Sequence, residues 1–426
     1  MSTRNICLAI FLLAFGIRSS QLFTLPANEL RFSPAPPEAL RAWDEGINTA
    51  YTLVSGGGFA DPFLSAPSGS SAHAAPSFPV VTAALFYVFG TGMTGGIARD
   101  VLEIAGYSLL FASLPWFALR LGMTAVPGIV SGVGAALYPF YSPHLMTRGR
   151  DEWLAGLAGM ALLVFGLRLA RAETLTRLSA LLYGAAWGAL MYVLPSMMPI
   201  LAAHVLIIFF ARRRPGSERL AFGVLFGVAF VLIVLPWTIR NRVVMGGWIF
   251  MRDDAGLELE VSNHDGATPS FDGNFANGTF CAIHPNCNAA AANRILQIGE
   301  LEFNRDAMAT AVEWIRRHPS RFLMLTLRRA ADFWFGLRAD AGLFLAKALV
   351  WLLGAAGLGL MWRRGFQLET SLMGVCWVVY PLVYYLIQYN ERYPVAISPA
   401  ILLPAGYMAV QLYLKARNSF AIGSKN

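Results

Sequence analysis

Two neighbouring acids, Asp44 and Glu45, stand in a polar stretch of an otherwise apolar sequence. The stretch covers residues 38–63 and separates a first apolar run from a second apolar region. A carboxylate at such a place could take the proton from an attacking hydroxyl group or hold a divalent cation. The pair could equally be the solvated first turn of an amphipathic helix, where the helix dipole stabilises acids. Whether the pair is a reactive site or a solvated helix start depends on the residues that surround it.

The composition is that of a polytopic membrane protein. Of the 426 residues, 56% are hydrophobic and only 14% are charged, which disfavours a soluble multidomain protein. The formal net charge is +8, but the basic residues fall in short clusters between apolar runs, as they do in cytoplasmic loops. We therefore assign this charge to membrane topology and expect no nucleic-acid partner.

Apolar runs predict an all-α polytopic bundle of about ten transmembrane helices, with both termini in the cytoplasm. The predicted spans are 5–23, 99–121, 124–142, 152–171, 178–194, 197–211, 219–239, 342–362, 368–388 and 395–414. We divide the chain into a transmembrane catalytic module at 1–239 with a first outer loop at 26–98, an outer segment at 240–341, and C-terminal transmembrane helices at 342–426. The outer segment after the seventh span is expected to be mixed, with an amphipathic helix near 300–317.

The apolar run 76–89 is predicted to be interfacial rather than spanning. It holds only about fourteen apolar residues, and a spanning helix needs at least about 17. Leaving it out of the span count places the triple-arginine run 212–214 inside, as the positive-inside rule prefers. The same topology places residues 148–152 outside, beside Asp44. We therefore expect interfacial helices in the first outer loop, including an amphipathic helix at about 37–54.

Polar residues from four outer loops lie on one side of the membrane in this topology. Carboxylates near arginines at a bilayer surface suit a lipid phosphate donor, because arginine binds phosphate oxygens while an acid takes a proton from the acceptor. The alternative is that the arginines are interfacial anchors and the acids are simply solvated. Besides Asp44 and Glu45, the candidates are His73, Asp151, Glu152, Arg240, Arg242, Asn263, His264, Arg392 and Tyr393.

Two of the four cysteines could form a loop disulfide, and the sequence leaves their pairing open. Cys281 and Cys287 lie in the polar sequence C-A-I-H-P-N-C, which is compatible with one bond if the loop faces an oxidising compartment. A metal site that also uses His284 is less favoured, because a fourth ligand is lacking.

Several short motifs resemble those of the GT-C membrane glycosyltransferases. D-E-G-I-N-T-A-Y, G-G-G-F-A-D-P-F and S-G-S-S-A-H-A-A-P-S-F-P look like the first outer loop of that group. P-W-T-I-R-N-R at 236–242, G-L-E-L-E-V-S-N-H at 256–264 and E-R-Y-P-V-A-I-S-P at 391–399 are similar to later landmarks and occur in the same order. The nearest patterns are those of protein O-mannosyltransferases, lipid A aminoarabinose transferase and rhizobial galacturonosyltransferase-like proteins.

The resemblance implies an inverting transfer of a single sugar from a polyprenyl-phosphate donor to a hydroxyl of a lipid, glycan or protein acceptor. It implies a multi-pass protein of the bacterial inner membrane with its active site facing the periplasm or cell exterior. Asp44 falls on the position of the base, with Glu45 beside it, and Asp151 or Glu152 falls where a second-loop acid is expected. The G-x-G-x-x-G and Walker motifs of nucleotide sites are absent.

The chain departs from the aminoarabinose-transferase pattern at one point. That pattern has Glu-Lys before a Pro-Pro pair, whereas this chain has His73 and Ala74 at those positions. A phosphate-contacting lysine is therefore missing, and Arg240 or Arg242 would have to replace it. A divalent cation, Mg²⁺ or Mn²⁺, is an optional cofactor, with Asp44 and His73 as its candidate ligands.

Two other functions are compatible with the sequence. A transporter or flippase of lipid-linked sugars would need a charged path through the bilayer, and the predicted spans contain few internal charges, chiefly Glu103 and Arg18. A non-catalytic scaffold for envelope assembly with the same fold would differ from the enzyme only in activity.

Overall fold

The described part of the chain is helical throughout. The computed structural model describes residues 2–21, 44–137, 150–336 and 341–423, and within these ranges it contains helices, turns and two isolated β-bridges. The outer segment, which was predicted to be mixed, is therefore a group of helices in its described part. Predictions that concern residues 26–43, 138–149 and 337–340 lie outside the described residues.

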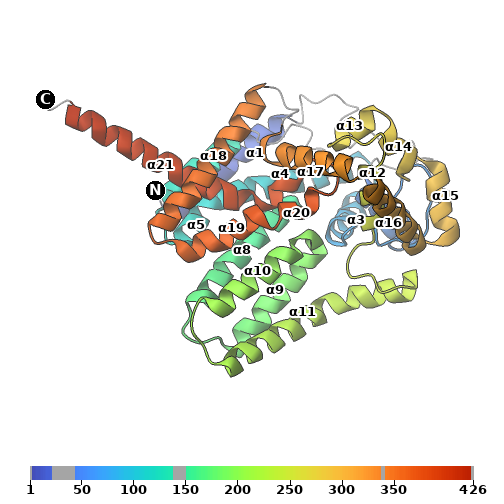
Figure 1. Ribbon diagram of the computed structural model, residues 1–426, viewed down its shortest axis with the longest axis horizontal. Helices are drawn as coiled ribbons and strands as arrows, with labels where there is room; N and C mark the ends of the chain where they lie inside the picture. Colours follow the sequence, from blue (N-terminus) through green and yellow to red (C-terminus); the bar gives the residue numbers. More distant parts are fainter. Residues whose placement is uncertain (1, 22–43, 138–149, 337–340, 424–426) are drawn as a thin grey trace.

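Apolar helices form the body of the molecule (Figure 1). Five of them are long and apolar enough to cross a membrane: Met93–Arg120, Glu152–Arg171, Gly216–Met245, Gly342–Arg363 and Tyr393–Ser419. Three apolar helices are shorter: Ser77–Phe89, Ala125–Leu137 and Pro195–Phe210. The protein is thus a multi-pass membrane protein, while the number of ten spans stays a prediction.

The element bounds follow the predicted spans closely. The helices of the body are α1 (Thr3–Gln21), α4 (Met93–Ala112), α5 (Leu114–Arg120), α6 (Ala125–Leu137), α8 (Glu152–Arg171), α9 (Arg177–Val193), η1 (Pro195–Met197), α10 (Met198–Phe210), α11 (Gly216–Met245), α18 (Ala341–Arg363), α19 (Gln367–Val378), α20 (Pro381–Tyr384), η2 (Tyr393–Ile397) and α21 (Ser398–Gly423). The predicted span 99–121 is divided into α4 and α5, and 368–388 into α19 and α20. Each second piece has a proline in its first turn, Pro115 and Pro381, and proline is tolerated there because the first N–H groups of a helix lack partners anyway.

Small residues let these helices approach one another closely, as in other membrane bundles. A Cβ atom at Gly357 of α18 would lie 2.0 Å from the carbonyl oxygen of Pro404 in α21. A Cβ atom at Gly406 would lie 2.4 Å from the carbonyl oxygen of Pro127 in α6. Glycine is therefore required where α21 crosses both neighbours.

Two short helices of the first outer loop lie beside the bundle. They are α2 (Glu45–Val54) and α3 (Ser77–Phe89). Helix α3 has 13 residues, or about 20 Å of helix, which is shorter than the roughly 30 Å hydrocarbon layer. Its Tyr87 and Val88 are strongly exposed, which fits the predicted interfacial position.

The outer segment forms a helical cap at one end of the bundle (Figure 1). Its helices are α12 (Ala255–Ser262), α13 (Phe271–Ala276), α14 (Thr279–Ile283), α15 (Ala289–Ile298), α16 (Glu300–Arg317) and α17 (Pro319–Phe335). Phe63 of the first loop shares a small core with Leu257 and Phe280 of the cap. Cys281 and Cys287, whose pairing the sequence left open, form a disulfide, and α16 has the predicted bounds.

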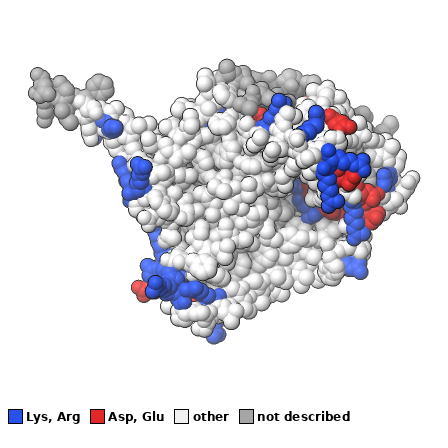
Figure 2. Space-filling model, viewed as in Figure 1, with Lys and Arg blue, Asp and Glu red and all other residues white. Residues whose placement is uncertain are grey.

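Figure 2 shows a broad uncharged surface between two charged ends. Mixed acidic and basic residues cover the cap, whereas Arg212 and Arg213, both exposed, lie in the loop between α10 and α11 at the far end of those helices. This separation agrees with the predicted topology, in which the cap and the arginine run face opposite sides of the membrane.

Candidate functional site

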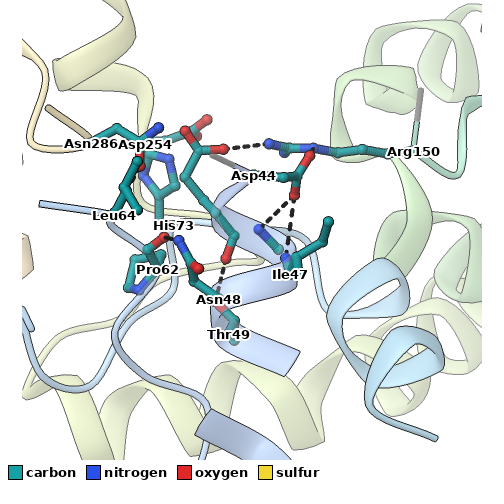
Figure 3. Close-up of polar contacts among 12 residues, drawn as sticks. Asp44, Ile47, Asn48, Thr49, Pro62, Leu64, His73, Arg150, Asp254 and Asn286 are labelled. Carbon is teal, nitrogen blue, oxygen red and sulfur yellow. Dashed lines mark hydrogen bonds and ion pairs between the residues drawn. The ribbon is translucent and has the colours of Figure 1, made fainter. Parts of the chain in front are cut away.

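Arg150 joins the two predicted acids of the first loop to the start of α8 (Figure 3). Asp44 is the N-cap of α2, and its Oδ1 accepts the N–H groups of Gly46 and Ile47. Its other oxygen, Oδ2, accepts a hydrogen bond of 3.2 Å from Nε of Arg150. Nη2 of the same guanidinium lies 2.5 Å from Oε2 of Glu45. Asp44 and Glu45 therefore share one cation.

Glu152 extends this network to the last outer loop. Its Oε2 accepts the backbone N–H of Arg150 at 2.7 Å, and its Oε1 lies 3.2 Å from Nη1 of Arg392. Burial opposes the charged form of Arg150, but Asp44, Glu45 and Glu152 together raise its pKa above the ordinary value. Arg150 thus stays a fixed cation in a site that is largely shielded from water.

A cavity of about 500 Å³ adjoins this network. One part of its wall is polar and consists of Arg150, Asp151, Glu152, Ser196, Arg252, Asp254, Glu258, Arg392 and Tyr393. The other part is mainly apolar and includes Val193, Leu194, Phe250, Met251, Val383, Leu386 and Ile387. Such a mixed wall suits a ligand with a polar head and an apolar tail.

Two carboxyl groups on this wall bind protons near neutral pH. Burial and the charge of Glu152 raise the pKa of Asp151 to about 7, although the Ser77 hydroxyl donates a hydrogen bond to its Oδ2. Burial and the charge of Asp254 raise the pKa of Glu258 to about 7. A carboxyl group with a pKa near the working pH is well suited to accept a proton in a reaction.

Seven predicted site residues are not among the described residues that line the cavity: Asp44, Glu45, His73, Arg240, Arg242, Asn263 and His264. Arg240 donates hydrogen bonds to the carbonyl groups of Ser71 and Phe59, at 2.7 and 2.8 Å. Arg242 is exposed and bonds to the carbonyl of Gly246, in its own helix cap. The arginines that do line the cavity are Arg150, Arg252 and Arg392, so the predicted replacement of the missing lysine by Arg240 or Arg242 is not supported.

Asn263 and His264 instead form hydrogen bonds with segments beside the cavity. Asn263 is buried, donates to the carbonyl of Leu386 and accepts a hydrogen bond from Arg329. His264 accepts the N–H of Gly266 through Nδ1. These contacts join the end of α12 to the loop that carries Arg392, and they leave both side chains away from the cavity wall.

The structure changes the predicted ligand set for a metal ion. One ligand atom from each of Glu45, His73 and His284 lies within 4.8 Å of the others, whereas Asp44 is turned toward Arg150 and its own helix. Burial lowers the pKa of His284 to about 4 and also lowers the pKa of His73, so both rings are neutral at pH 7, as metal binding requires. The pairing of His73 with Asp44 as metal ligands stays a prediction, and Glu45 is the acid whose oxygen lies within this group.

The fold is similar to that of a solved glycosyl-transferring protein. The structure of the oligosaccharyltransferase of Archaeoglobus fulgidus in the apo form matches with a TM-score of 0.53 and 15% sequence identity over 99% of this chain and 52% of that chain. The chain therefore spans about half the length of that protein. No protein-family model and no curated protein matches the sequence. At this identity the match establishes the fold, which is GT-C-like, as the sequence motifs imply.

Proposed function

We propose that this protein transfers a single sugar from a polyprenyl-phosphate donor to an acceptor hydroxyl at the outer face of a bacterial inner membrane. The observation that carries the proposal is the cavity beside the membrane bundle, in which three arginines, four acids and an apolar wall meet. The GT-C-like fold supports it, since its solved neighbour is an oligosaccharyltransferase. The acceptor is a lipid, a glycan or a protein.

The donor phosphate is assigned to Arg150 and Arg392. Both residues line the cavity, and Glu152 accepts the backbone N–H of Arg150 and pairs with the guanidinium of Arg392. Arginine forks bind phosphate oxygens and stabilise the negative charge that develops as the phosphate leaves. The apolar wall at Val193 and Ile387 would hold the first part of the lipid chain.

Asp151, rather than Asp44, is our proposed base. Asp151 lines the cavity and has a pKa near 7, whereas Asp44 reaches the cavity wall only through Arg150. Asp151 takes the proton of the acceptor hydroxyl while the acceptor oxygen bonds to the anomeric carbon. The bond between that carbon and the phosphate oxygen breaks, and its electron pair leaves with polyprenyl phosphate. In this scheme Asp44 and Glu45 position Arg150, and no step depends on the predicted Mg²⁺ or Mn²⁺.

Asp151→Asn tests the proposal directly. We expect the variant to lose about 10²- to 10⁴-fold in kcat, measured with a radiolabelled polyprenyl-phosphate sugar and membranes that contain equal amounts of protein. Asp306→Asn is the matched control, because Asp306 is an exposed acid of α16 that pairs with Arg294. Unchanged turnover by Asp151→Asn would refute the assignment of the base. Absence of transfer by the wild-type protein with every donor sugar would refute the proposed activity.

A further inference from the structure

A cluster of metal-ligating side chains lies behind the cavity wall. Glu45 comes from the first turn of α2, His73 from the segment before α3, and His284 from the loop after α14. Their candidate ligand atoms lie within 4.8 Å of one another, and the two imidazole ring centroids are 6.0 Å apart. None of the three is among the described residues that line the 500 Å³ cavity. The cluster therefore lies outside the cavity lining and is connected to it through the contact of Glu45 with Arg150.

The surroundings of this cluster are those of a built site. His73 and His284 are only 3% and 2% exposed, and Nδ1 of His73 has no hydrogen-bond partner among the described residues. A buried polar atom without a partner is costly unless a ligand satisfies it. Phe63 and Phe280 pack against the imidazole rings and limit their rotation.

The disulfide fixes the loop that supplies His284. Cys281 and Cys287 close the C-A-I-H-P-N-C segment around it. The same loop is tied to the first outer loop, because Asn286 accepts the N–H of Leu64 at 2.9 Å and Pro285 accepts the hydroxyl of Ser65 at 2.5 Å. The loop therefore holds His284 beside His73 in a defined position, although the two residues lie 211 positions apart in the sequence.

We infer that Glu45, His73 and His284 bind one Zn²⁺ ion that joins the first outer loop to the cap. Two imidazoles and a carboxylate form a ligand set that suits Zn²⁺ and leaves a fourth position for water. Mg²⁺ and Mn²⁺, which the acids alone had suggested, prefer sites made mainly of oxygen ligands. Because none of the three ligands is among the described residues that line the cavity, we assign the ion the role of joining the two loops, and the site differs from the cation first expected at Asp44.

Binding of Zn²⁺ would change the contacts that His284 makes with Asn286 and that Glu45 makes with Arg150. Nδ1 of His284 accepts the N–H of Asn286 at 3.0 Å, so the neutral ring carries its proton on Nε2. Coordination through Nε2 therefore requires the ring to move its proton to Nδ1, and the hydrogen bond from the N–H of Asn286 is then lost. Glu45 also contacts Arg150, so the ion shares this carboxylate with the guanidinium or replaces it there.

Zinc binding to the purified full-length protein tests the inference. The protein in detergent is first stripped with a chelator, and Zn²⁺ is then titrated in competition with a fluorescent zinc indicator. We expect one Zn²⁺ per chain, and at least about 100-fold weaker binding in His73→Ala and His284→Ala. His318→Ala is the matched control, because His318 is an exposed histidine of the same outer segment and should bind normally.

Two further measurements separate a lost site from a misfolded protein. The wild type should gain thermal stability with Zn²⁺, whereas His284→Ala should show the same Tm as the chelated wild type with or without the ion. The double variant Cys281→Ala, Cys287→Ala should bind more weakly than the wild type. Wild-type binding well below one ion per chain, or equal loss in His318→Ala, would overturn the inference. Asp151→Asn should keep its Zn²⁺, so failure of the zinc site and failure of the proposed activity are distinguishable.

Discussion

Arg150 and Arg240 are both held near the first outer loop, but by different kinds of partner. Arg150 contacts the carboxylates of Asp44 and Glu45 and lines the cavity. Arg240 donates to backbone carbonyl groups and lies over the ring of Trp237, 5.0 Å from its centroid. Carboxylates fix an arginine as a charged group that an anion can approach, whereas carbonyl groups use the guanidinium as a structural cross-link. The chemistry of the partner, rather than the residue type, separates the two roles.

The largest expected effect comes from removing the charge of Arg150. Arg150→Met should lower kcat/KM for sugar transfer by about 10²- to 10³-fold, since it deletes a donor to the leaving phosphate. Arg150→Lys should retain part of the activity, because lysine keeps the charge but lacks the planar fork. Steady-state kinetics at equal protein abundance would measure both. Full activity of Arg150→Met would remove the phosphate-binding role from this residue.

The pH dependence tests the environment of Asp151 beside Arg150. Because its pKa is raised to about 7, Asp151 is protonated below that pH and cannot accept a proton. The value of kcat/KM should therefore fall about tenfold for each pH unit below 7 and level off above it. The profile should lose this step in Asp151→Asn. A midpoint near pH 4 would mean that the carboxyl is solvated during the reaction.

Arg240 should affect stability much more than activity. Arg240→Met removes the hydrogen bonds to the carbonyl groups of Ser71 and Phe59, of which Phe59 keeps the N–H of Ser71 as a donor, and should cost about 1–3 kcal/mol of stability. Transfer per folded molecule should stay within about twofold of the wild type. Arg242→Met serves as a control in the same helix, because its exposed side chain contacts only its own cap. A loss of transfer in Arg240→Met comparable with that of Arg150→Met would erase the distinction between the two arginines.

Local patterns in the sequence were sufficient for much of the fold. The helices Glu152–Arg171 and Glu300–Arg317 have the predicted bounds, because an apolar run and an amphipathic period are each contained within one element. The disulfide was recognised as possible, since its cysteines are separated by only six positions in a polar loop. The division of the spans 99–121 and 368–388 was not predicted; the second helix of each begins with a proline in its first turn, Pro115 and Pro381.

The candidate site was only partly predictable. Asp151, Glu152, Arg392 and Tyr393 do line the cavity. The contacts of Arg150 with Asp44 and of Glu45 with His284 join residues that lie more than a hundred positions apart, and the sequence contains no local sign of such pairs. Arg240 and Arg242 look equivalent in the sequence, but residues two apart on a helix point in different directions.

Helix α8 begins at Glu152 directly after Arg150 and its N-cap Asp151, while Arg168 and Arg171 stand in its last turn. A rod of 20 residues is about 30 Å long, close to the thickness of the hydrocarbon layer. A thinner or thicker layer would tilt this rod and displace all three side chains as a unit relative to Arg392. The thickness of the surrounding lipid layer would thus change the distance between these three side chains and Arg392.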